Sequence, residues 1–231
     1  MQRAEYTARG PVPQDVVECV QRDTPTPKTG EVLLEMLAAP INPSDVLTLT
    51  GQYGMLPPLP AVGGNEGIGR VAALGDGVTT VVVGQRVLLP VGSGTWASHL
   101  LVPAAGLMAL PPVGDPLQLA MMTVNPPTAS LLLSEFVTLT PGDWVIQNAA
   151  NSGVGEYVIQ LAKRRGIRTV NVVRRHDAIA PLQALGGDVV LVDGPDLDAR
   201  VAEATGRAKI RLGFDCVGGS ATDRIARSLA I

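Results

Sequence analysis

The stretch from Gly142 to Arg175 constrains most strongly what this chain can fold into. It begins with a short apolar run, Asp143–Gln147, which follows a Pro-Gly turn and is typical of a buried parallel strand. Small polar residues at 148–153 then lead into an amphipathic run, Gly155–Arg165, and a β-branched run, Arg168–Val173. This order predicts a strand, a tight turn, a helix and a second strand, joined as a right-handed crossover unit.

The turn of this unit carries small residues where a dinucleotide-binding protein carries glycines. Such a turn binds a pyrophosphate, because the free backbone N–H groups and the dipole of the following helix face the anion. When Gly155 is aligned with the third glycine of the pattern GxGxxG, Ala150 and Ser152 occupy the first two places. The turn alone is therefore a weak motif, and a cofactor-free turn of an α/β fold is the alternative.

The end of the second strand is basic. Arg174 and Arg175 stand where NAD-dependent enzymes carry an acidic residue that binds the ribose 2′-hydroxyl, and His176 follows them. Arginine at this place pairs with a 2′-phosphate through its charge and through bidentate hydrogen bonds. The sequence therefore predicts NADPH in preference to NADH, with solvated surface arginines as the alternative.

Composition excludes several classes of protein. A net charge of −3 and an aromatic content of 3% give no reason to expect a nucleic-acid partner. The two cysteines, Cys19 and Cys216, form no ligand-spaced cluster, and no apolar run is long enough to span a membrane. We therefore expect no metal, nucleic-acid or membrane partner. The expected compartment is the cytoplasm, with the mitochondrial matrix, for a mature form, as the alternative.

Two domains are expected, divided at a proline-rich segment into residues 1–114 and 115–231. Short apolar runs between Gly and Pro turns predict a small, partly open β-barrel in the first domain. Alternating strands and helices predict a doubly wound parallel sheet in the second. Tyr53 is flanked by Gly51 and Gly54, which leave its ring accessible to a ligand; the alternative is a ring that packs the loop onto the barrel.

Eight segments, in chain order, resemble the medium-chain dehydrogenase/reductase superfamily, and within it the zinc-free 2-enoyl thioester reductases of the mitochondrial type. They are AAPINPSDV, GQYG, LPAVGGNEGIG, GTW, VNPPTA, PGDWVIQNAANSGVG, RTVNVVRR and CVGG. The resemblance implies an α/β protein with an N-terminal GroES-like β-barrel domain and a Rossmann NADPH-binding domain. Members of this family are longer than this chain, so we expect the cofactor domain to be incomplete at its C-terminal end.

The resemblance also implies roles for individual residues. Tyr53 matches the catalytic tyrosine, and Asn125 matches a position that contacts the cofactor. The pyrophosphate turn is matched by Asn151, Ser152, Gly153, Val154 and Gly155, and the 2′-phosphate site by Arg174, Arg175 and His176. Asn65 stands where zinc-dependent relatives have a histidine ligand, and their cysteine ligand near residues 43–45 is also missing. A catalytic zinc needs about three protein ligands, so zinc-independent chemistry is expected.

The activity implied is NADPH-dependent reduction of the C=C bond of a 2-enoyl thioester carried by CoA or by acyl carrier protein. Hydride goes to the β-carbon and negative charge develops on the thioester oxygen, where the neutral phenol of Tyr53 can donate a hydrogen bond. Whether Tyr53 also supplies the proton to the α-carbon stays open. The alternatives are an NADPH-dependent quinone or alkenal reductase and a non-catalytic NADPH-binding fragment. A homodimer is expected for the full-length form.

Overall fold

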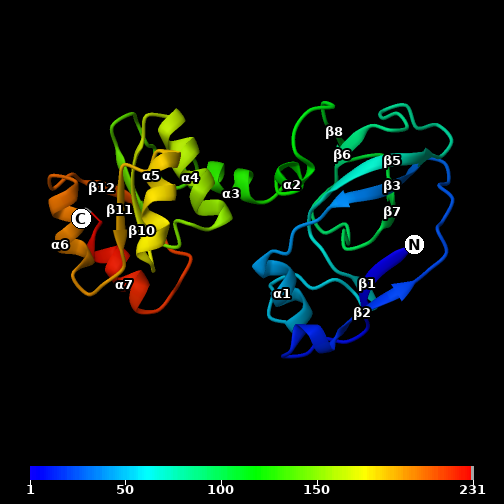
Figure 1. Cartoon of the computed structure of the whole chain (residues 1–231), viewed down its shortest axis with the longest axis horizontal. Coiled ribbons are helices and arrows are strands. Elements are labelled where there is room, and N and C mark those ends of the chain that lie inside the picture. The colour runs from blue at the N-terminus through cyan, green and yellow to red at the C-terminus, as the bar shows by residue number, and fades with distance from the viewer. Residues whose placement is uncertain (230–231) are drawn as a thin grey trace. The chain divides into compact units, whose positions relative to one another are not determined.

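The computed structural model describes residues 1–229 of the chain, which divides into two compact units, Met1–Val124 and Asn125–Ile231 (Figure 1). The division falls later than the boundary expected after Gly114. The reason is local, because Thr123 and Val124 donate hydrogen bonds to Glu66 and so belong with the first unit. The intervening helix α2 (Pro116–Leu119) is capped by the Asp115 side chain, which accepts the Leu117 N–H.

The first unit is built from two antiparallel sheets. Their strand orders are β7-β3-β5-β6-β8 and β2-β1-β4. The bounds are β1 (Gln2–Tyr6), β2 (Val17–Gln21), β3 (Glu31–Ala38), β4 (Ala61–Val62), β5 (Ile68–Leu74), β6 (Arg86–Leu88), β7 (His99–Pro103) and β8 (Met108–Ala109). A short 3-10 turn spans Pro13–Asp15. Apolar side chains that alternate along the strands, including Val32 and Leu34 of β3, Val71 of β5 and Val87 of β6, form the core.

Five of these strands, β2, β3, β5, β6 and β7, overlap the apolar runs that lie between Gly and Pro turns in the sequence, and three do not. Strand β1 alternates charged and apolar residues near the terminus, whereas β4 and β8 have two residues each, too few to show a period. Helix α1 (Pro43–Thr50) was also not expected. Its signals are a proline at its first position, the Asp45 carboxylate that accepts the Asn42 N–H at 2.7 Å, and Gly51 in the left-handed conformation at its end.

The second unit confirms the doubly wound parallel sheet. Its strand order is β11-β10-β9-β12, and every pair is parallel. The bounds are α3 (Asn125–Leu132), β9 (Trp144–Gln147), α4 (Gly153–Arg164), β10 (Arg168–Val173), α5 (Ile179–Leu185), β11 (Val189–Val192), α6 (Leu197–Ala204), β12 (Ile210–Phe214) and α7 (Ser220–Arg227). Among the described residues, no helix is long and apolar enough to cross a membrane.

Both faces of this sheet are covered, which explains its nearly continuous apolar strands. On one face Trp144 and Ile146 pack with Leu197 of α6 and Ile225 of α7. On the other face Val145 packs with α3 and α4, and Val173 packs with α5. The apolar run at Leu212–Val217 predicts a strand over that whole range. Strand β12 instead ends at Phe214, because Asp215 turns the chain by accepting the N–H groups of Val217 and Gly218.

Candidate functional site

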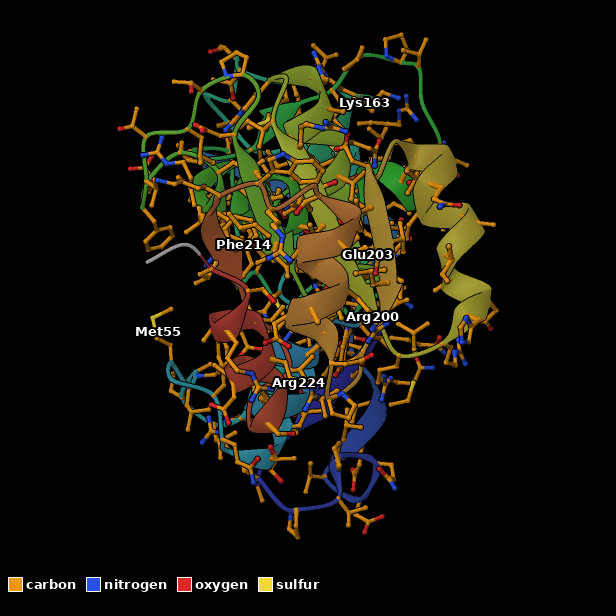
Figure 2. The ribbon with its side chains drawn as sticks, turned by 90° about the vertical axis from the view of Figure 1, so that its left-hand side faces the viewer. Met55, Lys163, Arg200, Glu203, Phe214 and Arg224 are labelled. Carbon is orange, nitrogen blue, oxygen red and sulfur yellow. The ribbon has the colours of Figure 1, made fainter. Side chains whose placement is uncertain are left out.

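A cavity of about 620 Å³ lies in the first unit. The wall that carries Tyr53 is the loop of residues 52–60, which follows α1, and the Tyr53 side chain is 38% exposed. Met55, which is 79% exposed, projects from the same loop (Figure 2). Polar side chains of α1, including Ser44 and Thr48, face the cavity together with Asn65. The cavity therefore combines apolar walls, a half-exposed phenol and a few convergent polar groups, as small-molecule sites do.

Asn65, which the resemblance matches to a histidine ligand of zinc-dependent relatives, forms a neutral pair with Ser44. Asn65 Nδ2 donates a hydrogen bond to Ser44 Oγ at 3.2 Å. Beside them the buried Asp45 carboxylate accepts the N–H groups of Asn42 and Asn65, at 2.7 and 2.9 Å. Burial raises the pKa of Asp45 above its ordinary value, and the nearby Glu66 carboxylate acts in the same direction. Within residues 1–229, no group of three or more His, Cys, Asp or Glu side chains could hold a metal ion.

Glu66 is fully buried and satisfied by four donors. Its Oε1 accepts from Asn42 Nδ2 at 2.9 Å. Its Oε2 accepts from the Thr123 N–H, the Thr123 hydroxyl and the Val124 N–H, at 3.1, 2.9 and 3.0 Å. Glu66 therefore fixes the two residues that directly precede Asn125. The sequence alone assigns no role to Glu66, although an acidic residue among glycines that are mostly buried is a signal of a satisfied buried carboxylate.

Replacing Glu66 with glutamine is expected to lower the free energy of unfolding by about 2–4 kcal/mol. The glutamine amide must point its NH₂ group either at the three donors that Oε2 now accepts or at Asn42 Nδ2, so at least one donor loses its acceptor. Water does not replace that acceptor at a buried site. Urea unfolding measures the change. The matched control is Glu35→Gln, whose exposed ion pair with Arg70 contributes less than about 1 kcal/mol. Equal midpoints for the two variants would contradict the anchoring role of Glu66.

Two glycines let Trp96 pack tightly beside the cavity. A Cβ on Gly63 would lie 2.3 Å from Trp96 Cε3, and one on Gly64 would lie 2.5 Å from Trp96 Cδ1. The indole Nε1–H donates to the Pro40 carbonyl oxygen at 3.0 Å. Trp96 therefore supports the backbone that lines the cavity. These contacts give Trp96 a packing role.

In the second unit, the expected cofactor turn joins β9 to α4. Ser152 is the N-cap of α4, and its Oγ accepts the Gly155 N–H at 3.2 Å. A Cβ on Gly155 would lie 2.5 Å from the Ala150 carbonyl oxygen, whereas one on Gly153 would meet Asn125 Nδ2 at 2.6 Å. The structure thus brings Asn125 against the turn of residues 151–155, and the resemblance implies contact with the cofactor for both.

A buried amide pair that sequence analysis missed holds this turn in place. Gln147 Nε2, at the end of β9, donates to the Gly155 carbonyl oxygen at 3.0 Å and to Asn171 Oδ1 at 2.8 Å. Asn171 Nδ2 donates in turn to Thr169 Oγ1 at 2.9 Å, within β10. The signal was present in the sequence, since both residues interrupt otherwise apolar buried strands.

The basic residues follow the carboxyl end of β10. Arg174, Arg175 and His176 are exposed, and His176 begins a short 3-10 turn, His176–Ala178. Arg175 Nε lies 3.3 Å from Asp177 Oδ1 in an exposed ion pair, which contributes little to stability. Strands β9 and β10 are parallel, so their carboxyl ends lie at the same edge of the sheet. Arg174, Arg175 and His176 therefore lie at the edge where α4 begins. An exposed arginine at this edge can bind an anion.

Asp215, just after β12, predicts how stability depends on pH. Hydrogen bonds from Thr222 and Asn148, and then from two backbone N–H groups, hold its pKa well below its usual range. A lowered folded-state pKa gives stability that is present above the unfolded value of about 4 and is lost as the pH falls further. We expect the Tm of the wild type to fall more steeply from pH 5 to pH 2 than that of Asp215→Asn, in a thermal scan at each pH. Parallel curves would contradict this source of acid sensitivity.

The two units together define a class. A β-barrel unit with a tyrosine-lined cavity, followed by a parallel-sheet unit with a small-residue turn before α4, is the arrangement of a medium-chain dehydrogenase/reductase. Residues 28–112 match the family model of the alcohol dehydrogenase GroES-like domain, and residues 153–231 match that of the zinc-binding dehydrogenase. These matches confirm the fold class expected from the sequence.

Similar proteins narrow the class. The chain is 41% identical over 228 residues to the mitochondrial enoyl-[acyl-carrier-protein] reductase of Rattus norvegicus. The match covers 94% of this chain and 60% of that protein. It is 31% identical, with a TM-score of 0.88, to the mitochondrial 2-enoyl thioester reductase Etr1p/Etr2p heterodimer of Candida tropicalis, over 99% of this chain and 72% of that one. The chain belongs to the 2-enoyl thioester reductase family. It spans about 60% of the length of the curated relatives it matches.

Proposed function

We propose that this protein acts in the NADPH-dependent reduction of the C=C bond of 2-enoyl thioesters. The observation that carries the proposal is the half-exposed phenol of Tyr53 on the wall of the cavity, in a chain that also forms a dinucleotide-type turn at α4. A similar protein, Etr1p, has been solved in a complex with NADP and crotonyl-CoA, and it is 30% identical with a TM-score of 0.88. That complex supports both the cofactor and the substrate class.

The second unit supplies the groups that would bind NADPH. The backbone N–H groups at the start of α4 suit the pyrophosphate, and residues 151–155 and Asn125 surround that place. Arg174 and Arg175, with His176, suit the 2′-phosphate, because guanidinium groups pair with phosphate oxygens at a fixed geometry. When bound, the cofactor supplies the hydride. The chain's own residues bind and orient it.

The first unit supplies the polarising group. As the β-carbon accepts hydride, charge moves onto the thioester oxygen, and a hydrogen bond from the Tyr53 hydroxyl stabilises that charge. The apolar walls, including Met55 and Leu56, suit the acyl chain and lower the local dielectric constant. No metal is required, because the phenol does what a Lewis acid would do at the oxygen. The proton for the α-carbon comes from Tyr53 or from solvent.

A quinone reductase is the second candidate, and one observation favours it. The chain is 31% identical, with a TM-score of 0.88, to an NADPH:quinone reductase of Bacillus thuringiensis, over 99% of this chain and 69% of that one. The cavity volume alone does not separate the two substrates. Tyr53 favours the thioester, because a donor aimed at one oxygen suits an enolate.

The carrier, the assembly and the compartment belong to the same proposal. The acyl group is carried by CoA or by acyl carrier protein, and the full-length protein is a homodimer. The curated relatives are named mitochondrial, which supports the mitochondrial matrix over the cytoplasm favoured by composition.

The test is the loss of NADPH absorbance with crotonyl-CoA, measured beside a small quinone, NADH and a control without substrate. We expect turnover with NADPH and crotonyl-CoA well above turnover with NADH or the quinone. Faster turnover of the quinone would overturn the thioester assignment. Thermal stabilisation by NADPH without turnover of either substrate would support the non-catalytic alternative instead.

A further inference from the structure

The loop of residues 52–60, which carries Tyr53, has few attachments to its own unit. Every residue of this loop is exposed. At its start the Gln52 N–H donates to the Leu47 carbonyl oxygen at 2.9 Å. Further along, the Pro57 carbonyl oxygen accepts from Arg9 Nη2, and these are the hydrogen bonds that join residues 52–60 to other parts of the described chain. Pro57, Pro58 and Pro60 have no N–H to add.

Arg9 contacts the chain just before this loop, at Gly51, and again within it, at Pro57. Its aliphatic stem lies against Gly51, where a Cβ would be 3.4 Å from Arg9 Cδ and 3.7 Å from Arg9 Cβ. Its guanidinium donates to Pro57. The neighbouring Gly10 N–H is hydrogen-bonded to the Leu49 carbonyl oxygen at 3.2 Å, so the backbone beside Arg9 is fixed to the end of α1. Tyr53 therefore lies between two points that the same side chain contacts.

The surroundings of Arg9 show that this placement has a cost. Arg9 Nε is buried and has no hydrogen-bond partner among the described residues. A buried donor without an acceptor destabilises the folded state, so the placement of this side chain requires a compensating reason. The side chain also interacts with Tyr6, which is 2% exposed and lines the same cavity. Arg9 thus connects the cavity wall formed by Tyr6 with the loop that carries Tyr53.

We propose that Arg9 is the positioning residue for Tyr53: its guanidinium holds the loop of residues 52–60 in place and thereby fixes the phenol at the cavity wall. The expected effect of Arg9 on turnover rests on the proposed function. The expected effect of Arg9 on the conformation of the loop rests only on its contacts. The proposed reaction uses no group of Arg9. This residue follows β1 and is distant in sequence from the loop that it holds.

The test compares Arg9→Met, Arg9→Lys and the control Arg70→Met. Methionine keeps an unbranched apolar stem against Gly51 and removes the donor to Pro57, whereas lysine keeps a positive donor. Arg70 is an exposed arginine of β5, paired with Glu35, outside the site. We expect Arg9→Met to lower kcat with crotonyl-CoA by about tenfold to a hundredfold, the range for a displaced catalytic group, with a smaller change in KM. Arg9→Lys should recover part of this loss, and Arg70→Met should match the wild type.

Two further readouts separate positioning from a general loss of structure. When Tyr53 is already phenylalanine, adding Arg9→Met should lower kcat by less than about threefold further, because both changes act through the same hydroxyl. Amide hydrogen exchange at Gln52, whose N–H is bonded to the Leu47 carbonyl oxygen, should be faster in Arg9→Met and unchanged in Arg70→Met, while exchange in β3 and β5 stays at the wild-type rate. Unchanged exchange in the loop, or a full additional loss in the Tyr53→Phe background, would overturn the proposal. If the wild type reduces no thioester, the exchange result alone decides the inference, and only the proposed function fails.

Discussion

Replacing Tyr53 with phenylalanine is expected to lower kcat for crotonyl-CoA by about 10²–10³-fold, the usual cost of removing one donor to a developing oxyanion. The ring is 38% exposed and its hydroxyl has no hydrogen bond among the described residues, so the free energy of unfolding should stay within about 0.5 kcal/mol of the wild type. Steady-state kinetics with NADPH and crotonyl-CoA measure kcat and KM separately. NADPH binding should not change, because its proposed contacts lie in the second unit.

The control for Tyr53→Phe is Met55→Leu, a change in the same loop at a side chain that is 79% exposed. It should leave kcat near the wild-type value, because it exchanges one apolar side chain of the cavity wall for another of similar volume and alters no hydrogen-bond donor. If Tyr53→Phe raised KM and left kcat unchanged, the phenol would bind substrate and transition state equally and would not be catalytic. If both variants lost activity together, the conformation of the loop, and not the hydroxyl, would limit turnover.

The sequence predicted the second unit better than the first. The β9–α4–β10 unit has long apolar runs with clear periods, and its boundaries lie within a few residues of those expected. Strand β1 and helix α1 were missed, because their signals are short and their stability comes from partners elsewhere in the chain. For β1 these partners are strands β2 and β4, paired on its two sides.

The candidate site was predictable where a motif marks it and unpredictable where contacts make it. Tyr53 and the turn at α4 stood out by their glycines. Glu66 was quoted but given no role, because its four donors come from distant residues. Arg9 looked like any surface arginine in the sequence, because its partner Pro57 lies far along the chain and offers only a carbonyl oxygen. Buried polar residues thus become interpretable only when their partners are known.

Replacing Gly155 with alanine is expected to weaken NADPH binding by about a hundredfold or more and to lower Tm by several degrees. The new Cβ would lie 2.5 Å from the Ala150 carbonyl oxygen and 2.7 and 2.8 Å from its C and Cα, all backbone atoms that cannot rotate away. Overpacking of this kind costs about 1–3 kcal/mol, roughly 2–12 °C at the 2–4 °C per kcal/mol typical of a chain of this length. The start of α4 must then move, and the N–H groups proposed for the pyrophosphate move with it. Fluorescence titration with NADPH and a thermal scan measure the two effects.

Two alanine variants test whether backbone contact is the cause. A Cβ on Gly153 would meet Asn125 Nδ2, the end of a side chain that can turn aside, so Gly153→Ala should affect Tm less than Gly155→Ala. A Cβ on Gly194 would meet only side-chain ends of Arg200 and Asp196, at 3.0 and 3.2 Å, so Gly194→Ala should change Tm by less than about 2 °C. If Gly155→Ala bound NADPH as tightly as the wild type, the turn at α4 would not contact the pyrophosphate. If it lost binding but kept the wild-type Tm, α4 would accommodate the methyl group, and the loss would come from direct contact of the methyl group with the cofactor.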